Sequence, residues 1–361
     1  MSFAERKAVV DLSHALLEEG LVVRTWGNIS HRTTGGSFVI TPSGRNYTTM
    51  IEADLAQVSV EGDKVVDKSG PFKPSSEYPM HALCYRLRPD ANAVVHTHQR
   101  YASALSLMGT TVELTDREAE LIGQRNIPIA SYGLPGTGKL HKNVEQVLQE
   151  FPEANVLLLE AHGVFLCGDT PDHALELAQN VEIAARRVYQ ETTGSNLSRH
   201  FPAEHDVTRS ELVQHEHSAG STPTVRYFHG DQDITAAVGY DVRRAHETAY
   251  AGRKKARAIR VSRDGEVAQF TSRTLKPYLD DFAQIVGRQA DATPRSNVVF
   301  TKDGALCLGK DDDDARAVQS VLEKNARAAR IAESSGREPI NDWECRLMNA
   351  VYQLKYSKQA G

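Results

Sequence analysis

Apolar residues in the first half of the chain recur at helical spacing in several segments. Residues 3–19 form one such segment, in which charged residues separate the apolar ones and Gly20 ends the predicted helix. Further helices are predicted over 80–86, over 101–107 and after Thr170-Pro171-Asp172, whose threonine and proline suit a helix start. The apolar positions that define the first and last of these helices are Ala8, Val9, Leu12, Leu16 and Leu17, and Ala174, Leu177, Ala178, Val181 and Ala185.

Short apolar runs between turn residues predict strands. They lie at 21–24, 38–40, 94–95 and 156–159. Residues 109–126 show neither the helical spacing of apolar residues nor the alternation of a strand, and they carry several acidic side chains, so an irregular segment is expected there. Helices and strands therefore alternate through the first half of the chain.

Three histidines lie beside predicted strand ends. His96 and His98 follow Val94-Val95, and side chains two apart on a strand leave the same face, about 7 Å apart along it. His162 follows the strand at 156–159 and precedes Gly163. Three neutral ligands with an open fourth position are typical of a catalytic zinc site. Taken singly, each histidine also fits a polar strand surface or a strand-to-turn corner.

A carboxylate stands at a predicted helix start in Pro74-Ser75-Ser76-Glu77. Glu77 could serve as a general base or as a fourth metal ligand. The alternative is a structural carboxylate at the helix N-terminus, with Ser75 or Ser76 as the cap.

Two pairs of small residues make a plausible phosphate cradle, Ser43-Gly44 and Ser75-Ser76. Hydroxyls and N–H groups at a helix N-terminus are what a phosphate dianion binds. Gly27-Asn28 could join them, since glycine lets the backbone approach a ligand and the Asn28 amide donates to an oxyanion, although a simple β-turn fits as well. Gly136-Thr137-Gly138-Lys139 lacks the spacing of a nucleotide-binding loop and reads as a helix-entry turn.

Five ordered stretches resemble the class II aldolase/adducin family. The resemblance covers residues 1–192, about half of the chain. The stretches are Thr25-Trp26-Gly27-Asn28-Ile29-Ser30, Ile40-Thr41-Pro42-Ser43-Gly44, Pro74-Ser75-Ser76-Glu77, Arg88 to His98, and Ala161-His162-Gly163.

The resemblance implies a fold and a chemistry. The expected fold is α/β (α+β), a three-layer α/β/α arrangement around a mainly antiparallel sheet. The expected enzyme is a zinc-dependent aldolase, with Zn²⁺ or another divalent transition metal on His96, His98 and His162. It would cleave a fuculose-phosphate-like ketose 1-phosphate into dihydroxyacetone phosphate and an aldehyde through a metal-bound enediolate.

The resemblance also assigns roles to single residues. Glu77 would move the proton at carbon, and Tyr132 would give a proton to the aldehyde oxygen, although a half-buried structural tyrosine fits Tyr132 equally. Gly27, Asn28, Ser43, Gly44, Ser75 and Ser76 would hold the substrate phosphate. Family members imply a homo-oligomer, usually a tetramer.

Other activities of the family stay open. Glu77 favours an aldolase, because related 4-epimerases carry an aspartate there, whereas Thr25-Trp26-Gly27-Asn28 looks more like the epimerase loop. A decarboxylase of an oxo-sugar-acid phosphate and a non-catalytic, adducin-like scaffold are the remaining alternatives.

Charge and composition narrow the partners. A formal net charge of −5 argues against nucleic acid or an anionic membrane as the main partner. The N-terminal residues lack a hydrophobic signal core, and no stretch approaches the roughly 20 apolar residues of a membrane span. Four scattered cysteines form no disulfide framework, which favours a reducing cytoplasm.

The second half of the chain shows a faint internal repeat. Residues 193–224 read as a linker, and residues 225–361 as a smaller, degenerate, metal-free copy of the first domain, 1–192. A shift of 141 residues places Asp303-Gly304 on His162-Gly163. A second match places 281–289 on 90–98, so that Gly287 and Gln289 replace the other two histidines.

Overall fold

The structure is a computed structural model, and its chain divides into two compact units. The first contains residues 1–197 with 331–337 and 353–361, and the second contains 198–330 with 338–352. The structure describes residues 3–62, 64–195, 210–216, 224–229, 232–233, 258–293, 295–302 and 304–356. No helix within these ranges combines the length and the apolar character needed to cross a bilayer.

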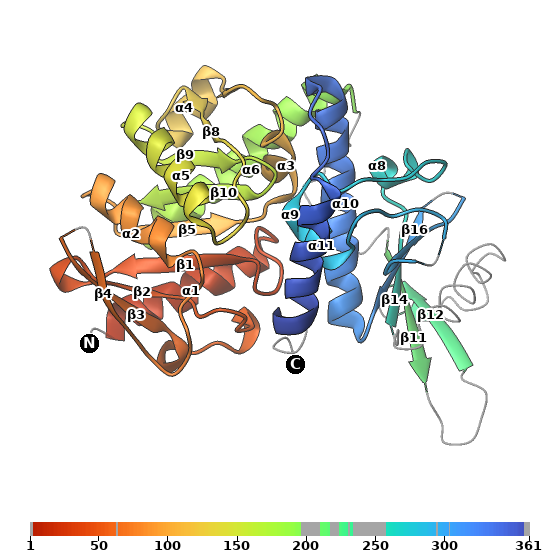
Figure 1. The fold of residues 1–361 in the computed structure, drawn as a ribbon, viewed down its shortest axis with the longest axis horizontal. Helices are drawn as coiled ribbons and strands as arrows, with labels where there is room; N and C mark the ends of the chain where they lie inside the picture. Colours follow the sequence, from red (N-terminus) through yellow and green to blue (C-terminus); the bar gives the residue numbers. More distant parts are fainter. Residues whose placement is uncertain are drawn as a thin grey trace. The chain divides into compact units, whose positions relative to one another are not determined.

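The first unit is built on an eight-stranded sheet with the order β4-β3-β2-β1-β5-β10-β9-β8 (Figure 1). Every pairing is antiparallel except that of β8 with β9. All residues of β5, β9 and β10 are buried, which their apolar sequences favour in a strand covered on both faces. The strands are β1 (Gly27–Arg32), β2 (Phe38–Ile40), β3 (Ala56–Glu61), β4 (Lys64–Ser69), β5 (Ala93–Thr97), β8 (Ile129–Ala130), β9 (Val156–Leu159) and β10 (Gly163–Gly168).

Helices cover this sheet in two groups. One group is α1 (Phe3–Glu18), α3 (Arg100–Leu105) and α4 (Asp116–Ile122), which all contact α6 (Pro171–Thr193), and the other is α2 (Tyr78–Leu87) with α5 (Gly138–Glu150). Apolar side chains of α2 and α5, including Met80, Cys84, Val144 and Leu148, pack with sheet residues such as Phe165 in one continuous core. The predicted three-layer arrangement is confirmed. Short 3₁₀ turns occupy Thr34–Gly36, Tyr47–Thr49 and Glu52–Asp54.

Two predicted segments of the first unit differ from the structure. Residues 21–24 form no strand, only an isolated bridge between Val23 and Trp26, and β1 begins at Gly27 instead. The segment 109–126 is not irregular, because it contains β6 (Val112–Glu113), α4 and β7 (Asn126–Ile127). A capping box of Thr115 and Glu118 starts α4, and this T-x-x-E pattern was readable in the sequence.

The second unit contains a six-stranded sheet with the order β13-β12-β11-β14-β16-β15, antiparallel throughout. Its first strand, β11, lies inside the predicted linker 193–224, so that segment is not a linker along its whole length. The strands are β11 (Ser210–Glu216), β12 (Thr224–His229), β13 (Gln232–Asp233), β14 (Ala258–Ser262), β15 (Val298–Phe300) and β16 (Ala305–Gly309). The helices of this part of the chain are α8 (Gly265–Ala268), α9 (Asp280–Ile285), α10 (Asp312–Ser335) and α11 (Asp342–Val351), followed by a π turn at Tyr352–Tyr356. The last turn of α10, from residue 331, and the π turn from residue 353 belong to the first unit.

Four neighbouring strands of the second sheet follow the same order, along the chain and across the sheet, as four neighbouring strands of the first. The run β11-β14-β16-β15 of the second sheet corresponds to β1-β5-β10-β9 of the first. Gly163 at the start of β10 and Gly304 just before β16 each face a backbone oxygen at the end of the paired strand, Thr97 O in the first sheet and Ser262 O in the second. Val261 therefore takes the place of His96, and Arg263 that of His98.

This register corrects the second sequence match. Residues 281–289 do not form a strand like 93–97, because 280–285 are the helix α9. Gly287 and Gln289 are consequently not the counterparts of His96 and His98. Asp303, the predicted counterpart of His162, lies outside the described residues.

Candidate metal centre

Three adjacent strands place the predicted ligands at one end of the first sheet. Asn28 of β1, His96 of β5 and Phe165 of β10 pair directly with one another across the strands, so their side chains leave the same face. His98 lies just past the end of β5, and His162 occupies the turn between β9 and β10. In that turn Ala161 has a φ of 59°, a left-handed conformation that a non-glycine residue adopts at a cost of about 1–2 kcal/mol.

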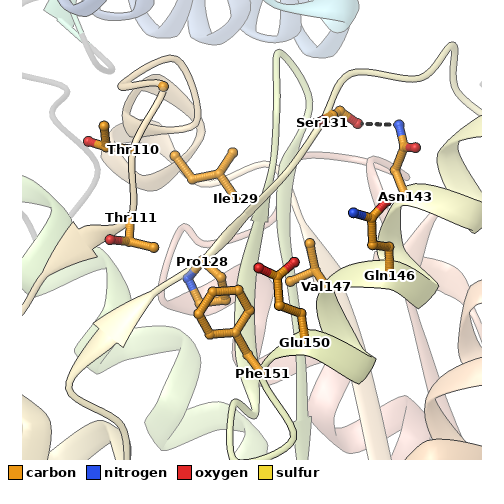
Figure 2. Close-up of a pocket in the computed structure, with 11 residues that line it drawn as sticks. Thr110, Thr111, Pro128, Ile129, Ser131, Asn143, Gln146, Val147, Glu150 and Phe151 are labelled. Atoms are coloured by element: carbon orange, nitrogen blue, oxygen red, sulfur yellow. Dashed lines mark hydrogen bonds between the residues drawn. The ribbon is translucent and has the colours of Figure 1, made fainter.

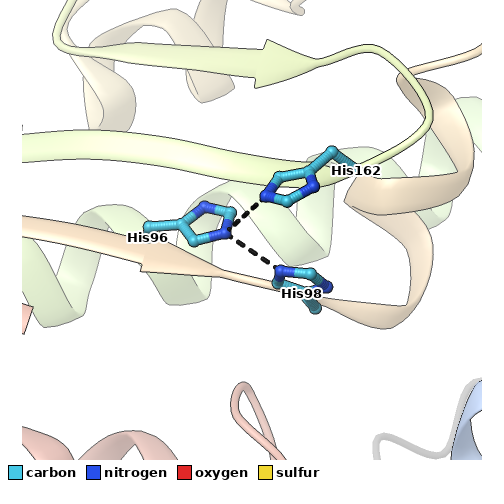
Figure 3. A group of neighbouring side chains, drawn as sticks. All are labelled: His96, His98 and His162. Atoms are coloured by element: carbon cyan, nitrogen blue, oxygen red, sulfur yellow. Dashed lines mark hydrogen bonds between the residues drawn. The ribbon is translucent and has the colours of Figure 1, made fainter. Parts of the chain in front are cut away.

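The three imidazoles meet at a single point (Figure 3). His96 Nε2 lies 2.9 Å from His98 Nε2 and 3.0 Å from His162 Nε2. One ring nitrogen from each histidine lies within 4.8 Å of the other two. His96 and His162 are buried, and His98 is half-buried. The structure thus brings together all three histidines that the sequence singled out.

The hydrogen bonding of His96 decides what this point can hold. Its Nδ1 lies 2.7 Å from the Val164 carbonyl oxygen, which can only accept, so the proton is on Nδ1 and Nε2 is bare. Burial holds the pKa of His96 well below its usual value, which keeps the ring neutral. A bare nitrogen can accept only one hydrogen bond, yet two other imidazole nitrogens face it. The arrangement fits a divalent cation bound by three imidazoles, a donor set that suits zinc and other transition metals.

Glu77 faces the same point from the N-terminus of α2. Its Oε1 lies 3.3 Å from His162 Nε2, and its Oε2 lies 3.5 Å from His96 Nε2. Asn28 Nδ2 donates to Oε2 at 2.7 Å. The residue is the N-cap of α2, but its side chain makes no capping hydrogen bond and turns to the imidazoles instead.

The charge of Glu77 follows from these neighbours. Burial alone would raise the pKa of the carboxyl group. His96, His162 and the Asn28 hydrogen bond outweigh burial and hold the pKa well below its usual value. An ionised, buried carboxylate beside three imidazoles can act as a fourth ligand or as a proton acceptor.

The two halves of the predicted phosphate cradle lie side by side. An isolated bridge joins Pro42 to Pro74, Ser43 N donates to Lys73 O at 2.9 Å, and Ser75 N donates to Thr41 O at 3.1 Å. These bonds bring Ser43-Gly44 next to Ser75-Ser76, with Ser75 buried and Ser76 exposed.

Gly27 owes its place to close packing. It adopts a φ of 125°, and a Cβ there would lie 2.5 Å from His96 O, so only glycine fits. The buried Tyr47 hydroxyl donates to Gly27 O at 2.8 Å. Gly27-Asn28 thus begins β1 in a fixed conformation beside the three histidines.

Tyr132 is tied to the fold through its backbone. Its N–H donates to Glu160 Oε2 at 2.9 Å, and Asn143 Nδ2 donates to its carbonyl oxygen at 3.2 Å. These bonds connect it to the residue that follows β9 and to α5 rather than to the three histidines. Its part in proton transfer stays a prediction.

A separate pocket of about 220 Å³ opens beside residues 128–131, just before Tyr132 (Figure 2). Figure 2 shows the Ser131–Asn143 hydrogen bond at one end of it. None of the predicted site residues lines the pocket, so it is not the predicted site. Its walls are Gly109, Thr110, Thr111, Pro128, Ile129, Ser131, Asn143, Gln146, Val147, Glu150 and Phe151.

The sequence reasoning missed a buried residue behind the site. His81 lies on α2 one helical turn after Glu77, and its Nε2 is 2.5 Å from Asn28 Oδ1. The signal was present, because residues four apart on a helix share a face. Burial lowers the pKa of His81 to about 3, so the ring is neutral.

Comparisons with known proteins match about half of this chain. Residues 7–189 match the model of a family described as Class II Aldolase and Adducin N-terminal domain. An L-fuculose phosphate aldolase of Haemophilus influenzae is 33% identical over 177 residues, which are 49% of this chain and 78% of that protein. A 5-methylthioribulose-1-phosphate/5-deoxyribulose-1-phosphate aldolase of Rhodospirillum rubrum is 31% identical over 187 residues, 52% of this chain and 81% of that protein.

Solved structures also resemble part of this chain. One of an L-fuculose 1-phosphate aldolase is 25% identical, with a TM-score of 0.49, and covers 56% of this chain and 92% of its own. Another L-fuculose-1-phosphate aldolase, from Thermus thermophilus, is 27% identical, with a TM-score of 0.44, and covers 53% of this chain and 97% of its own.

Proposed function

The chain belongs to the class II aldolase and adducin family and is a class II aldolase, a carbon–carbon lyase; from this premise we propose that its substrate is a ketose 1-phosphate. The products would be dihydroxyacetone phosphate and an aldehyde. The observation that carries the proposal is the convergence of His96, His98 and His162 on one point, with the Glu77 carboxylate within 3.3–3.5 Å of His162 and His96.

Three imidazoles are the residues that would hold the metal, and zinc is the proposed ion. A divalent metal there supplies Lewis acidity toward the oxygens of the substrate carbonyl and its adjacent hydroxyl. His96 keeps its Nε2 bare through the bond between Nδ1 and Val164 O, and the ring stays neutral because it is buried.

Glu77 is the proposed acid–base group at carbon. In the condensation direction the ionised Glu77 takes a proton from the carbon that will form the bond, and that carbon then bonds to the aldehyde carbon. Cleavage is the reverse: the hydroxyl proton passes to the Tyr132 oxygen, the bond electrons stay with the three-carbon fragment, and the carbon that carried the bond regains its proton from Glu77. Asn28 keeps one carboxylate oxygen hydrogen-bonded, so the other remains directed at the reacting centre. Tyr132 is the proposed proton donor to the aldehyde oxygen.

The phosphate group would lie against the cradle. Ser75 and Ser76 stand at the N-terminus of α2, and Ser43 and Gly44 sit in the turn bridged to them. The serine hydroxyls there, with the helix dipole, favour a dianion. With the Gly27-Asn28 segment beside them, they form the proposed phosphate site.

The experiment is an assay over a panel of sugars. The purified protein is incubated with L-fuculose 1-phosphate, 5-deoxyribulose 1-phosphate and 5-methylthioribulose 1-phosphate, and dihydroxyacetone phosphate is measured enzymatically. Dihydroxyacetone phosphate is expected from at least one of these sugars. Its formation should stop after chelation of the metal and resume when zinc is added. No product from any sugar, with zinc bound at one equivalent, would overturn the substrate proposal.

For the second unit we propose a metal-free copy of the first fold. The matching order of four strands and the matching glycines support it, as does the helix start, where Thr170 and Asp311 each accept a hydrogen bond from the N–H three residues later. Val261 and Arg263, which take the places of His96 and His98, cannot bind zinc as imidazoles do. Metal analysis should therefore give one zinc per chain, and two would contradict the proposal.

A further inference from the structure

A continuous chain of buried hydrogen bonds runs from the core of the first unit to Glu77. Tyr85 OH lies 2.8 Å from Ser30 Oγ, and Ser30 Oγ lies 2.6 Å from His81 Nδ1. His81 Nε2 lies 2.5 Å from Asn28 Oδ1, and Asn28 Nδ2 lies 2.7 Å from Glu77 Oε2. All five side chains are buried, so water does not take over any of these bonds.

The hydrogen bonds of this series can all be donated in one of only two directions, toward Glu77 or away from it. If every donor points toward Glu77, His81 is protonated on Nε2, and Tyr85 donates to Ser30. If every donor points away, His81 is protonated on Nδ1, and Tyr85 must donate elsewhere. Its other acceptor is Asn92 O at 3.4 Å, which is long for an O–H···O bond. Tyr85 donates across the short 2.8 Å distance to Ser30 only when the donors point toward Glu77, so the two distances favour that direction.

We propose that His81 is a positioning residue, a neutral imidazole with its proton on Nε2 that holds the Asn28 amide so that its NH₂ group faces Glu77. The imidazole is itself locked in place. Its ring meets Phe165 edge-on with 5.7 Å between centroids and stacks near Phe38 at 6.4 Å. Because Phe165 pairs with His96 across the strands, the ring that orients Asn28 rests on the strand next to the metal ligand.

The orientation of Asn28 matters because an amide can rotate by half a turn. If the Asn28 amide were turned so that its carbonyl oxygen faced Glu77, two negatively polarised oxygens would face each other and Glu77 Oε2 would lack a donor. A buried acceptor without a donor is costly, and the carboxylate would turn to another partner. His81 prevents this rotation, since its Nε2–H requires an oxygen opposite it. The role rests on the proposed function, in which Glu77 handles the proton at carbon.

Two substitutions separate the two ends of the imidazole. In His81→Gln the side-chain amide reaches the position of Nε2 and can still donate to Asn28, whereas in His81→Asn the oxygen reaches only the position of Nδ1 and still accepts from Ser30. His173→Gln and His173→Asn, at a half-exposed histidine of α6 paired with Asp169 at 2.7 Å, are the matched controls. Zinc content, melting temperature, kcat and KM are measured for all four.

The positioning role predicts unequal losses. His81→Asn should lower kcat on the order of 10- to 100-fold, as expected when the partner that orients a site residue is removed, with zinc content unchanged. His81→Gln should keep kcat close to that of the unmutated protein. Equal losses in the two variants, or no loss in His81→Asn, would overturn the proposal, because a residue that only fills the core does not distinguish its two nitrogens.

The tautomer can be measured without any assay of activity. Long-range ¹H–¹⁵N spectra of the unmutated, histidine-labelled protein report which ring nitrogen of His81 carries the proton, and His81→Gln assigns the signal. Protonation on Nε2 is expected, and protonation on Nδ1 would refute the inference even if both variants failed to fold. If the unmutated protein shows the Nε2–H form but cleaves no ketose 1-phosphate, the proposed function fails and the hydrogen-bond assignment stands.

Discussion

Acidification should destabilise the first unit through His81. The folded structure holds the pKa of this buried ring at about 3, against an ordinary value of 6.5. The unfolded chain binds the proton below about pH 6.5 and the folded chain does not. The full stability is therefore present above pH 6.5 and declines as the pH falls toward 3.

The magnitude follows from the two pKa values. Each pKa unit corresponds to about 1.4 kcal/mol, so the difference allows a loss of roughly 5 kcal/mol well below pH 3, of which about 4 kcal/mol is reached at pH 3. Between pH 7 and pH 5 the same linkage gives about 2 kcal/mol. A loss of this size is a large part of the stability of an ordinary domain, which is about 5–15 kcal/mol.

The assay is urea unfolding of the metal-free protein at pH 7, 6 and 5. Tryptophan fluorescence is the probe, in a Trp343→Phe background so that Trp26 of the first unit is the only reporter. The same series with His81→Gln removes the titrating ring and keeps every other group. The unmutated background should lose about 2 kcal/mol more than the variant between pH 7 and pH 5. Parallel curves would refute the reasoning, because they would mean that folding does not keep His81 neutral.

Three further outcomes are expected. Glu77→Gln should leave fold and zinc nearly unchanged but lower the rate about a hundredfold or more, as loss of an acid–base group does, and near-normal turnover would refute its role. Gly163→Ala places a methyl group 2.4 Å from Thr97 O and 3.2 Å from a His96 ring carbon, so the free energy of unfolding should fall by about 1–3 kcal/mol and zinc should bind more weakly. The control, Gly138→Ala, meets open space and should change neither quantity. Equal behaviour of the two variants would contradict this packing. Removing the metal with a chelator should lower the melting temperature, and an unchanged melting curve would show that the folded site binds no metal.

The three histidines could be predicted because strand geometry is local. Two residues apart on a strand means the same face, and the apolar run before His96 identified the strand. The position of His162 beside them depended on the pairing of β5 with β10, which single-sequence periodicity does not contain. His162 was grouped with the other two without that pairing, because each histidine lies beside a predicted strand end, and the family resemblance supported the grouping.

The network behind the site could not be predicted from periodicity. Asn28 was expected in a turn after a strand at 21–24, whereas it is the second residue of β1 and pairs with His96. The bond from His81 to Asn28 joins a helix to a strand 53 residues away. A contact at that separation depends on tertiary packing, to which local propensity gives no access.

The mistaken match of 281–289 has a physical cause. A short apolar run such as Phe282-Ala283-Gln284-Ile285-Val286 fits a strand and a buried helix equally well. The helix prevails in the structure as α9. The match around Gly304 was more informative, because a glycine pressed against a backbone oxygen is a constraint of the fold rather than of local pattern.

Asn28, His96 and Phe165 form a row across three strands, so catalytic activity depends on the correct register of those strands. If β1 or β10 slid by a single residue against β5, every side chain of that strand would swap faces, and the amide or the ring would point into the opposite layer. Such a molecule could retain its secondary structure and most of its compactness and still be inert. Specific activity per bound metal ion therefore measures the fraction of molecules whose central strands are correctly aligned.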